Sequence, residues 1–387
     1  MGMGARGTPF RRSLGRTLAI LHPVFALTGV CHSIGGPLLP SLAPTFHLND
    51  SQAGFLLFSY FAGTSLGALL CGSRNARTLT LGFVALTGAA MAVASTNRIF
   101  LYPVFLLFGI CVGIPMTAVS MHAGRTFGAR AAAPLTFLNF SWSAGALLAP
   151  LLAARLLVSH TFRAAYVILA GASFVAAIAC GLGLEDSPEP EAPAIPVSRI
   201  VNLRFVALFA FLAFLEVGVE NSTASWLATY VLRTAGIGAT WAAAASSFYW
   251  CGFLASRGVS SLLLLRVDAG RLLRGAVLVG IVAGVGLIAM PGSLYHLAAM
   301  AILGAALAPV FPLLLARFFA QAHDSADSRW VLALCGFGGS VLPWLAGVIS
   351  AATGSLRLGL IVIPAALLTI ACALPLVSTQ RFEREAE

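Results

Sequence analysis

The stretch EDSPEPEAPAIPVSRIVN occupies residues 185–202, close to the middle of the chain. It holds four prolines and four acidic residues, and a segment of that composition cannot bury itself in a packed core. The chain is strongly apolar on both sides of it. The stretch therefore predicts an extended linker at 185–202 between two domains, residues 1–184 and residues 203–387.

The two flanking regions consist of apolar runs that are long enough to cross a bilayer. Of the 387 residues, 59% are hydrophobic and 9% are charged, and the mean hydropathy is +0.93. About 18 or more apolar residues in a helix span the roughly 30 Å of hydrocarbon, and these runs are apolar on all sides, unlike helices of a soluble core. We predict an all-α membrane protein with twelve transmembrane helices in two six-helix bundles. The predicted spans are 17–40, 52–73, 78–97, 99–122, 132–157, 163–184, 203–232, 238–265, 271–290, 293–319, 329–352 and 357–378.

The distribution of arginine predicts the orientation. All 23 basic residues are arginine, and cationic loops are retained on the cytoplasmic side of a membrane. If the N-terminus is inside, seventeen arginines fall in cytoplasmic segments and five on the other side, while Arg257 lies within the eighth span. We expect a multi-pass protein of the inner (plasma) membrane of the cell, with both termini cytoplasmic.

Several classes of function lack the residues that they require. The seven cysteines show neither CxxC pairs nor Cys/His ligand spacing, which indicates free thiols and no metal site. The sequence has no GxxxxGK[ST] phosphate loop and no Ser/His/Asp order of a hydrolase. It also has no basic patch with interleaved aromatic residues. We therefore expect no enzyme activity, no cofactor and no nucleic-acid partner.

Two spacings recur at about half the length of the chain. The pattern Y-x-x-G at 60–63 reappears at 249–252, 189 residues later, and G-x-x-x-x-P at 145–150 reappears at 338–343, 193 residues later. Two six-helix repeats related by an axis along the membrane normal are typical of secondary transporters, which bind their cargo near the midplane between the repeats. The recurrence predicts one central site with alternating access.

Three stretches carry more specific patterns: VGVENSTASWLATY at 217–230, YWCGFLASRGVSSLLLLR at 249–266 and GGSVLPWLAG at 338–347. They resemble motifs of the major facilitator superfamily, in particular of its fucose-permease-like branch of sugar transporters. The resemblance implies a monomer that carries a sugar with a proton as the coupling ion. The loop GALLCGSRNAR at 67–77 departs from the pattern G-x-L-x-D-R-x-G-R of the superfamily, since it lacks the aspartate.

Glu216 and Glu220 lie within the seventh span, where a carboxylate costs on the order of 2.5–3.5 kcal/mol. They are four residues apart and share one helical face. Because two ionised carboxylates so close together repel, at least one is expected to hold a proton near neutral pH. Counted at ~1.5 Å per residue from the cytoplasmic ends, Arg257 lies about 12 Å deep, Glu216 about 18 Å and Glu220 about 24 Å. We predict that Glu216 pairs with Arg257 and that Glu220 exchanges the proton; a static ion pair between helices seven and eight is the alternative.

His32, near the middle of the first span, is a candidate proton relay or hydrogen-bond donor because imidazole changes its charge near neutral pH. Sugar transporters of the resembling branch tend to carry an acidic residue in helix one or four, and this chain has none there. The alternative for His32 is a packed histidine with satisfied hydrogen bonds.

Aromatic and amide side chains in the spans suit a carbohydrate, since indole rings stack on sugar faces and amides bridge neighbouring hydroxyl groups. Tryptophan near the end of a span is also an ordinary anchor at the membrane surface. The predicted substrate-binding residues are Asn139, Trp142, Glu220, Asn221, Trp226, Tyr249, Trp250 and Trp344.

These patterns predict a proton-coupled secondary transporter of a small polar solute, with a sugar as the first choice of cargo. The same acids and aromatic residues would also suit a proton-driven exporter of hydrophobic drugs or metabolites. An organic-anion carrier would use Arg257 and a protonated histidine. A sensor or assembly protein without transport would need neither a cavity nor a proton.

Overall fold

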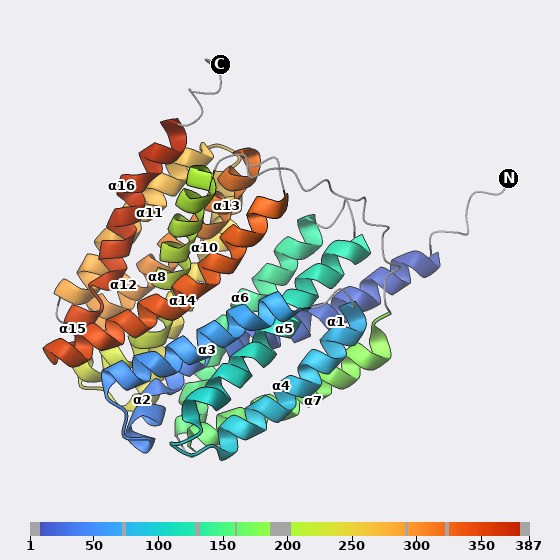
Figure 1. The fold of residues 1–387 in the computed structure, drawn as a ribbon, viewed down its shortest axis with the longest axis horizontal. Helices are drawn as coiled ribbons and strands as arrows, with labels where there is room; N and C mark the ends of the chain where they lie inside the picture. Colours follow the sequence, from blue (N-terminus) through green and yellow to red (C-terminus); the bar gives the residue numbers. More distant parts are fainter. Residues whose placement is uncertain are drawn as a thin grey trace.

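The computed structural model describes residues 8–71, 75–127, 132–158, 161–185, 203–290, 293–321 and 325–379. Throughout these ranges the regular structure is helical (Figure 1). The predicted linker lies outside the described residues except for Glu185. The domain bounds 1–184 and 203–387 therefore stay a prediction.

The helices form two groups, one before the linker and one after it. The first group comprises α1 (Thr8–Ser33), α2 (Gly35–Thr45), α3 (Asp50–Leu70), α4 (Asn75–Ser95), α5 (Leu101–Phe127), α6 (Ala132–Leu157) and α7 (Phe162–Gly183). The second comprises α8 (Leu203–Ala235), α9 (Ala239–Ala245), α10 (Ser247–Leu263), α11 (Ala269–Ala289), α12 (Ser293–Leu307), α13 (Val310–Gln321), α14 (Ser325–Thr353), α15 (Leu356–Gly359) and α16 (Val362–Thr379).

Twelve crossings are built from these helices. Eleven segments of the described chain are long and apolar enough to span a bilayer, and three of them contain two helices each, namely α1–α2, α12–α13 and α15–α16. The remaining crossing consists of α9 and α10, which are separated at Ser246 and so form no single helix of that length. The predicted twelve-helix membrane fold is confirmed, with span ends that differ from the prediction by a few residues.

The break between α1 and α2 falls at Ile34, directly before the Gly-Gly-Pro sequence at 35–37. Proline has no N–H with which to continue the hydrogen bonds of a helix. In the last turn of α1, the carbonyl oxygen of Cys31 accepts a hydrogen bond from the hydroxyl of Tyr60 on α3 at 3.1 Å. Because main-chain polar groups within a bilayer need partners inside the protein, Tyr60 stabilises this break.

Glycines let pairs of helices within each group pack backbone against backbone. A Cβ atom added at Gly63 of α3 would overlap the main chain of α5, and one at Gly252 of α10 would overlap that of α12. Gly145 of α6 stands in the same way against α1, and Gly338 of α14 against α8. These four glycines belong to the two recurring spacings, so the internal repeat corresponds to equivalent helix pairs in the two groups.

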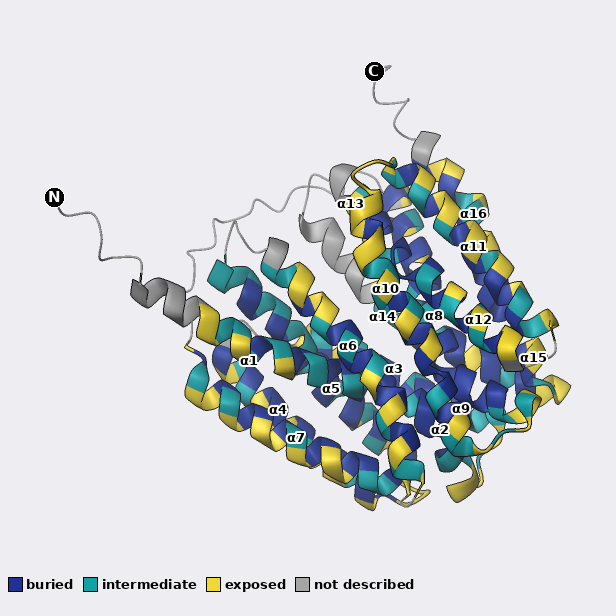
Figure 2. Cartoon of the chain, turned by 180° about the vertical axis from the view of Figure 1, so that it is seen from behind, coloured by how far each residue is buried: buried dark blue, intermediate teal, exposed yellow. Residues whose placement is uncertain are grey.

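The outer helices expose apolar side chains. Figure 2 shows exposed segments along α4, α7 and α11, and Val84, Val175 and Val282 on these helices are 51%, 64% and 73% exposed. Extended apolar surface of this kind marks contact with a partner or a membrane. In this fold it is the surface that faces lipid.

The two groups lie side by side (Figure 1) and meet through α3 with α14, α2 with α8 and α9, and α6 with α9 and α10. Helices α3, α8, α10 and α14, together with the junction of α1 and α2, therefore surround the centre of the molecule. This arrangement brings the candidate site residues of both groups together.

Gly109→Ala is expected to lower the thermal stability, because its added Cβ would overlap the carbonyl oxygen of Tyr60 across the α3–α5 contact. Overpacking of this kind costs about 1–3 kcal/mol. Gly171→Ala in α7 is the matched control: its Cβ meets nothing within 4 Å, and alanine favours a helix over glycine by about 1 kcal/mol. Thermal unfolding of the two purified variants in detergent measures the difference. Equal melting temperatures would contradict the close α3–α5 packing.

Candidate functional site

The middle of α8 carries two carboxylates. Glu216 is fully buried, and neither of its carboxylate oxygens has a hydrogen-bond partner within the described residues. Glu220, one turn further along, is partly exposed, and it ends a line of accessible positions at helical spacing that begins at Ala207 and passes through Phe211. The buried carboxylate is thus followed by one that can be reached from outside.

Arg257 of α10 reaches across to the first group of helices. Its Nη1 donates to the main-chain oxygen of Asn139 at 3.2 Å and to Oγ of Ser143 at 2.9 Å, both on α6. Its guanidinium also lies over the ring of Phe253, 4.8 Å from the centroid. Arg257 therefore connects the two groups of helices.

The predicted ion pair between Glu216 and Arg257 is not formed in this structure. In the described part of the chain, ion-pair contact is made only between Asp50 and Arg233. The physical reason is that the guanidinium of Arg257 takes oxygen partners on α6, whereas the carboxylate of Glu216 is enclosed. The charges of Arg257 and the two glutamates still act on one another at longer range.

Tyr249 brings a hydroxyl group to the same region. Tyr249, Phe253 and Arg257 are spaced four residues apart on α10 and so share one helical face. The side chain of Tyr249 is fully buried, and its hydroxyl has no partner among the described residues. It lies near enough to Glu220 and Glu216 for their charges to act on it.

His32 of α1 and Asn221 of α8 face one another across the two groups. Their side chains interact, and together with Ser33, Ser225 and Trp250 they line an enclosed pocket of about 10 Å³. That volume holds about one water molecule. The structure thus joins His32 to the turn of α8 that follows Glu220, in an arrangement that is closed around the pocket.

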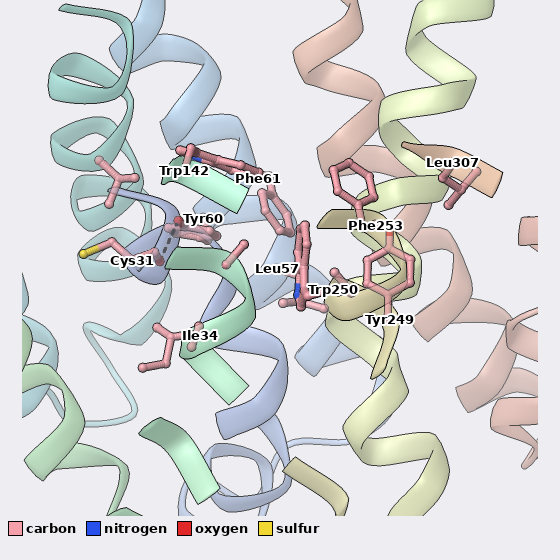
Figure 3. Packing of buried hydrophobic residues seen from close by; sticks show 14 of the residues in the cluster. Cys31, Ile34, Leu57, Tyr60, Phe61, Trp142, Tyr249, Trp250, Phe253 and Leu307 are labelled. Carbon is pink, nitrogen blue, oxygen red and sulfur yellow. Dashed lines mark hydrogen bonds between the residues drawn. The ribbon is translucent and has the colours of Figure 1, made fainter. Parts of the chain in front are cut away.

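An aromatic layer connects the two groups beside this pocket, as Figure 3 shows. The indole rings of Trp142 on α6 and Trp250 on α10 meet edge to face with centroids 5.9 Å apart, and the His32 ring lies 5.4 Å from Trp142. Tyr249 and Phe253 extend the layer at 5.1 and 5.3 Å from Trp250. The buried Nε1 of Trp142 has no partner in the described ranges, so the layer contains a free donor.

Three of the predicted substrate-binding side chains have partners within the protein. The amide of Asn139 donates to a carbonyl of its own helix at 2.9 Å. Trp226 is fully buried and donates from Nε1 to the carbonyl oxygen of Pro343 on α14 at 2.9 Å. Trp344 packs edge to face on Phe58 of α3 with centroids 5.9 Å apart. In this conformation Trp226 and Trp344 stabilise contacts of α14 with α8 and α3.

One ionic cluster closes the end of the molecule at which α3 begins and α8 ends. Arg233, in the last turn of α8, donates to Asp50 at the start of α3 through Nη1–Oδ2 at 2.7 Å and Nη2–Oδ1 at 2.6 Å. Ser350 of α14 donates its hydroxyl to Oδ2 of the same carboxylate at 2.5 Å. Gly54 of α3 and Gly347 of α14 pack closely beside it. We call Asp50, Arg233 and Ser350 the latch.

Sequence reasoning missed the latch, although a signal for it exists. Asp50 is the sole acidic residue among the first 184 residues, and Arg233 is one of the few arginines predicted away from the cytoplasmic side. Sequence reasoning also missed Ser143, which looks like an ordinary small residue of a membrane helix. Its role depends on the position of Arg257 in the other group.

Asp50→Asn is expected to weaken the latch and to favour opening of the end that it closes. Because the side chains of Arg233 and Asp50 are 44% and 15% exposed, we expect an effect of about 1 kcal/mol, or roughly a fivefold change in the ratio of open to closed molecules. Spin labels on cysteines at Phe100 and Leu294, in a background without native cysteines, measure the distance between the two groups at this end.

The double variant Asp50→Arg with Arg233→Asp is the control, since it restores an opposite-charge pair and should partly restore the short distance. Distance distributions that are identical in the wild type and Asp50→Asn would show that the latch does not hold this end closed.

Comparison with known proteins places this architecture in a family. A model of the Major Facilitator Superfamily matches residues 21–328. A glucose/galactose transporter of Brucella abortus biovar 1 (strain 9-941) is 26% identical over 377 residues, covering 90% of each chain. The crystal structure of a D-xylose-proton symporter is similar with a TM-score of 0.77 at 14% identity, covering 93% of this chain and 97% of that chain. The transporter FucP in its outward conformation gives a TM-score of 0.63 at 17% identity, covering 93% and 98%. The resemblance predicted from the motifs is confirmed: the chain belongs to the Major Facilitator Superfamily and is a multi-pass membrane transporter rather than an enzyme.

Proposed function

We propose that this protein carries a small sugar across a plasma membrane together with a proton, by alternating access to the site between its two groups of helices. The observation that carries the proposal is a cluster of buried polar atoms without partners in the described structure. The cluster comprises both carboxylate oxygens of Glu216, the hydroxyl of Tyr249, Nε1 of Trp142, Nδ1 of His32 and Nε of Arg257.

Such a cluster suits a polyhydroxylated ligand. A buried polar group without a hydrogen bond costs free energy, so polar groups that stay unpaired at the centre of a transporter favour a cargo that pairs with them. Each hydroxyl of a sugar both donates and accepts, which matches the acceptors of Glu216 and the donors of Trp142 and Tyr249. The rings of Trp142 and Trp250 supply the apolar faces on which a sugar ring stacks.

The two carboxylates of α8 support a proton as the coupling ion. Glu216 and Glu220 lie one turn apart, and two ionised carboxylates at that spacing repel. The buried Glu216 is enclosed, whereas Glu220 is accessible. We assign the exchangeable proton to Glu220, which lies in the same turn of α8 as Asn221.

The relatives support a sugar as the class of cargo. A glucose/galactose transporter is similar over nearly the whole chain, and a D-xylose-proton symporter shares the fold. The distribution of arginine supports cytoplasmic termini. With that orientation the latch lies on the outer face, and the structure corresponds to a state that is closed to the outside. We propose a monomer that needs no cofactor besides the proton.

Transport by the purified protein in liposomes tests the proposal. Glucose, galactose, xylose and fucose are offered under an inward proton gradient, with an organic acid and a lipophilic cation in parallel arms. Accumulation of a sugar that collapses when the gradient is dissipated supports the proposal. Proton-driven movement of the lipophilic cation alone would support a drug exporter, and movement of the organic acid alone would support an anion carrier that uses Arg257.

Glu220→Gln is expected to keep sugar counterflow and to lose proton-driven accumulation, because glutamine keeps the size and hydrogen bonds of the side chain but does not exchange a proton. Both quantities are measured in the same liposomes. Glu185→Gln is the matched control, since it makes the same substitution at an exposed position after α7 and should keep both. Full accumulation by Glu220→Gln would remove Glu220 from the coupling step.

A further inference from the structure

The internal repeat relates the surroundings of Glu220 to a site in the first group of helices. Tyr60 and Tyr249 are 189 residues apart, and so are Gly29 and Gly218. Gly29 of α1 packs against the main chain of α6, and Gly218 of α8 packs against α14. With the same offset, Glu220 is the equivalent of Cys31.

The two tyrosines occupy equivalent positions in space as well as in sequence. The carbonyl oxygen of Tyr60 is the atom that a Cβ at Gly109 would meet, and the carbonyl oxygen of Tyr249 is the atom that a Cβ at Gly304 would meet. Tyr60 therefore stands to α5 as Tyr249 stands to α12. Each tyrosine also projects toward the helix that carries its equivalent partner, Cys31 for Tyr60 and Glu220 for Tyr249.

The hydrogen bonds of the two tyrosines differ because the partner helices differ. The hydroxyl of Tyr60 donates to the carbonyl oxygen of Cys31, next to the break between α1 and α2. α8 is continuous from Leu203 to Ala235, so the carbonyl oxygen of Glu220 belongs to an unbroken helix. The hydroxyl of Tyr249 is left buried and without a partner in the described structure, near the side chain of Glu220.

We infer that Tyr249 is a positioning residue for the proton site: its hydroxyl donates to the carboxylate of Glu220 when Glu220 has released its proton. This inference rests on the proposed role of Glu220 in coupling. An ionised carboxylate is a stronger acceptor than a protonated one. The bond therefore forms on proton release and weakens on proton uptake, which ties α10 to α8 in one protonation state.

Other charged and titratable groups also face this region. They are Glu216 on α8, Arg257 on α10, His32 on α1 and Cys335 on α14. Arg257 favours the ionised form of Glu220 by its charge, and Glu216 opposes it when it is itself ionised. Tyr249 differs from both because its hydroxyl acts by direct hydrogen bonding and carries no charge.

Tyr249→Phe tests the inference through the pH profile of sugar counterflow, measured with equal pH on both sides of the liposome. Counterflow should fall as the pH rises and the carrier loses its proton. Without the hydroxyl, the ionised carboxylate loses a hydrogen bond, so the midpoint should move toward alkaline pH by about one pH unit. The variant should also melt no lower than the wild type, since it removes a buried hydroxyl without a partner.

Tyr60→Phe is the matched control, because it makes the same substitution at the equivalent position. It removes the bond to Cys31, so its melting temperature should fall while its pH midpoint stays unchanged. An unchanged midpoint in Tyr249→Phe, or an equal shift in both variants, would overturn the inference.

A second comparison covers the case in which Tyr249→Phe folds poorly. In the Glu220→Gln background, counterflow should be independent of pH, and adding Tyr249→Phe should not alter its pH profile. A pH shift caused by Tyr249→Phe in that background would show that the tyrosine acts on another group. If Glu220→Gln alone keeps the pH midpoint of the wild type, the proposed coupling role of Glu220 fails, which is a different result from failure of the tyrosine inference.

Discussion

The scarcity of hydrogen-bond partners inside a bilayer is the constraint on which this structure depends. A polar group in hydrocarbon has to be satisfied by the protein itself, so the described chain is helical and its breaks are stabilised by side chains. Tyr60 does this between α1 and α2, and Ser246 donates to the carbonyl oxygen of Ala243 between α9 and α10 at 2.7 Å. The exceptions are informative: unpaired polar atoms gather at the centre, around Glu216 and Tyr249.

The two ends of the contact between the helix groups differ in kind. At the end closed by the latch, α3 and α14 approach closely, and Asp50 receives two hydrogen bonds from Arg233 and one from Ser350. Nearer the middle, contact is made by Arg257 on α6 and by the rings of Trp142 and Trp250. Long polar side chains and aromatic edges can separate with little repacking, whereas backbone contacts cannot. The centre of the interface is therefore the part best suited to open around a cargo.

The sequence was sufficient for the membrane fold, because apolar runs of bilayer length and the recurring glycine spacings are local properties of the chain. It also located Glu216, Glu220, His32, Trp142, Tyr249 and Trp250, since charged and aromatic residues stand out in apolar helices. The choice of partner was beyond it. Depth counting placed Arg257 opposite Glu216, but the rotation of α10 directs Arg257 to Ser143 on α6. Trp226 and Trp344 likewise gave no sign in the sequence that α14 would occupy their rings.

The backbone contacts at Gly63, Gly252, Gly145 and Gly338 have a consequence for how such a protein can diversify. These helix pairs are held by main-chain atoms that meet at glycine, so their spacing does not depend on which side chains point toward the centre. A duplicated half could thus exchange an imidazole for an amide, or a thiol for an acid, without disturbing its frame. His32 with Asn221 and Cys31 with Glu220 are such exchanges, and through them two copies of one scaffold came to hold unlike chemistry on either side of a shared axis.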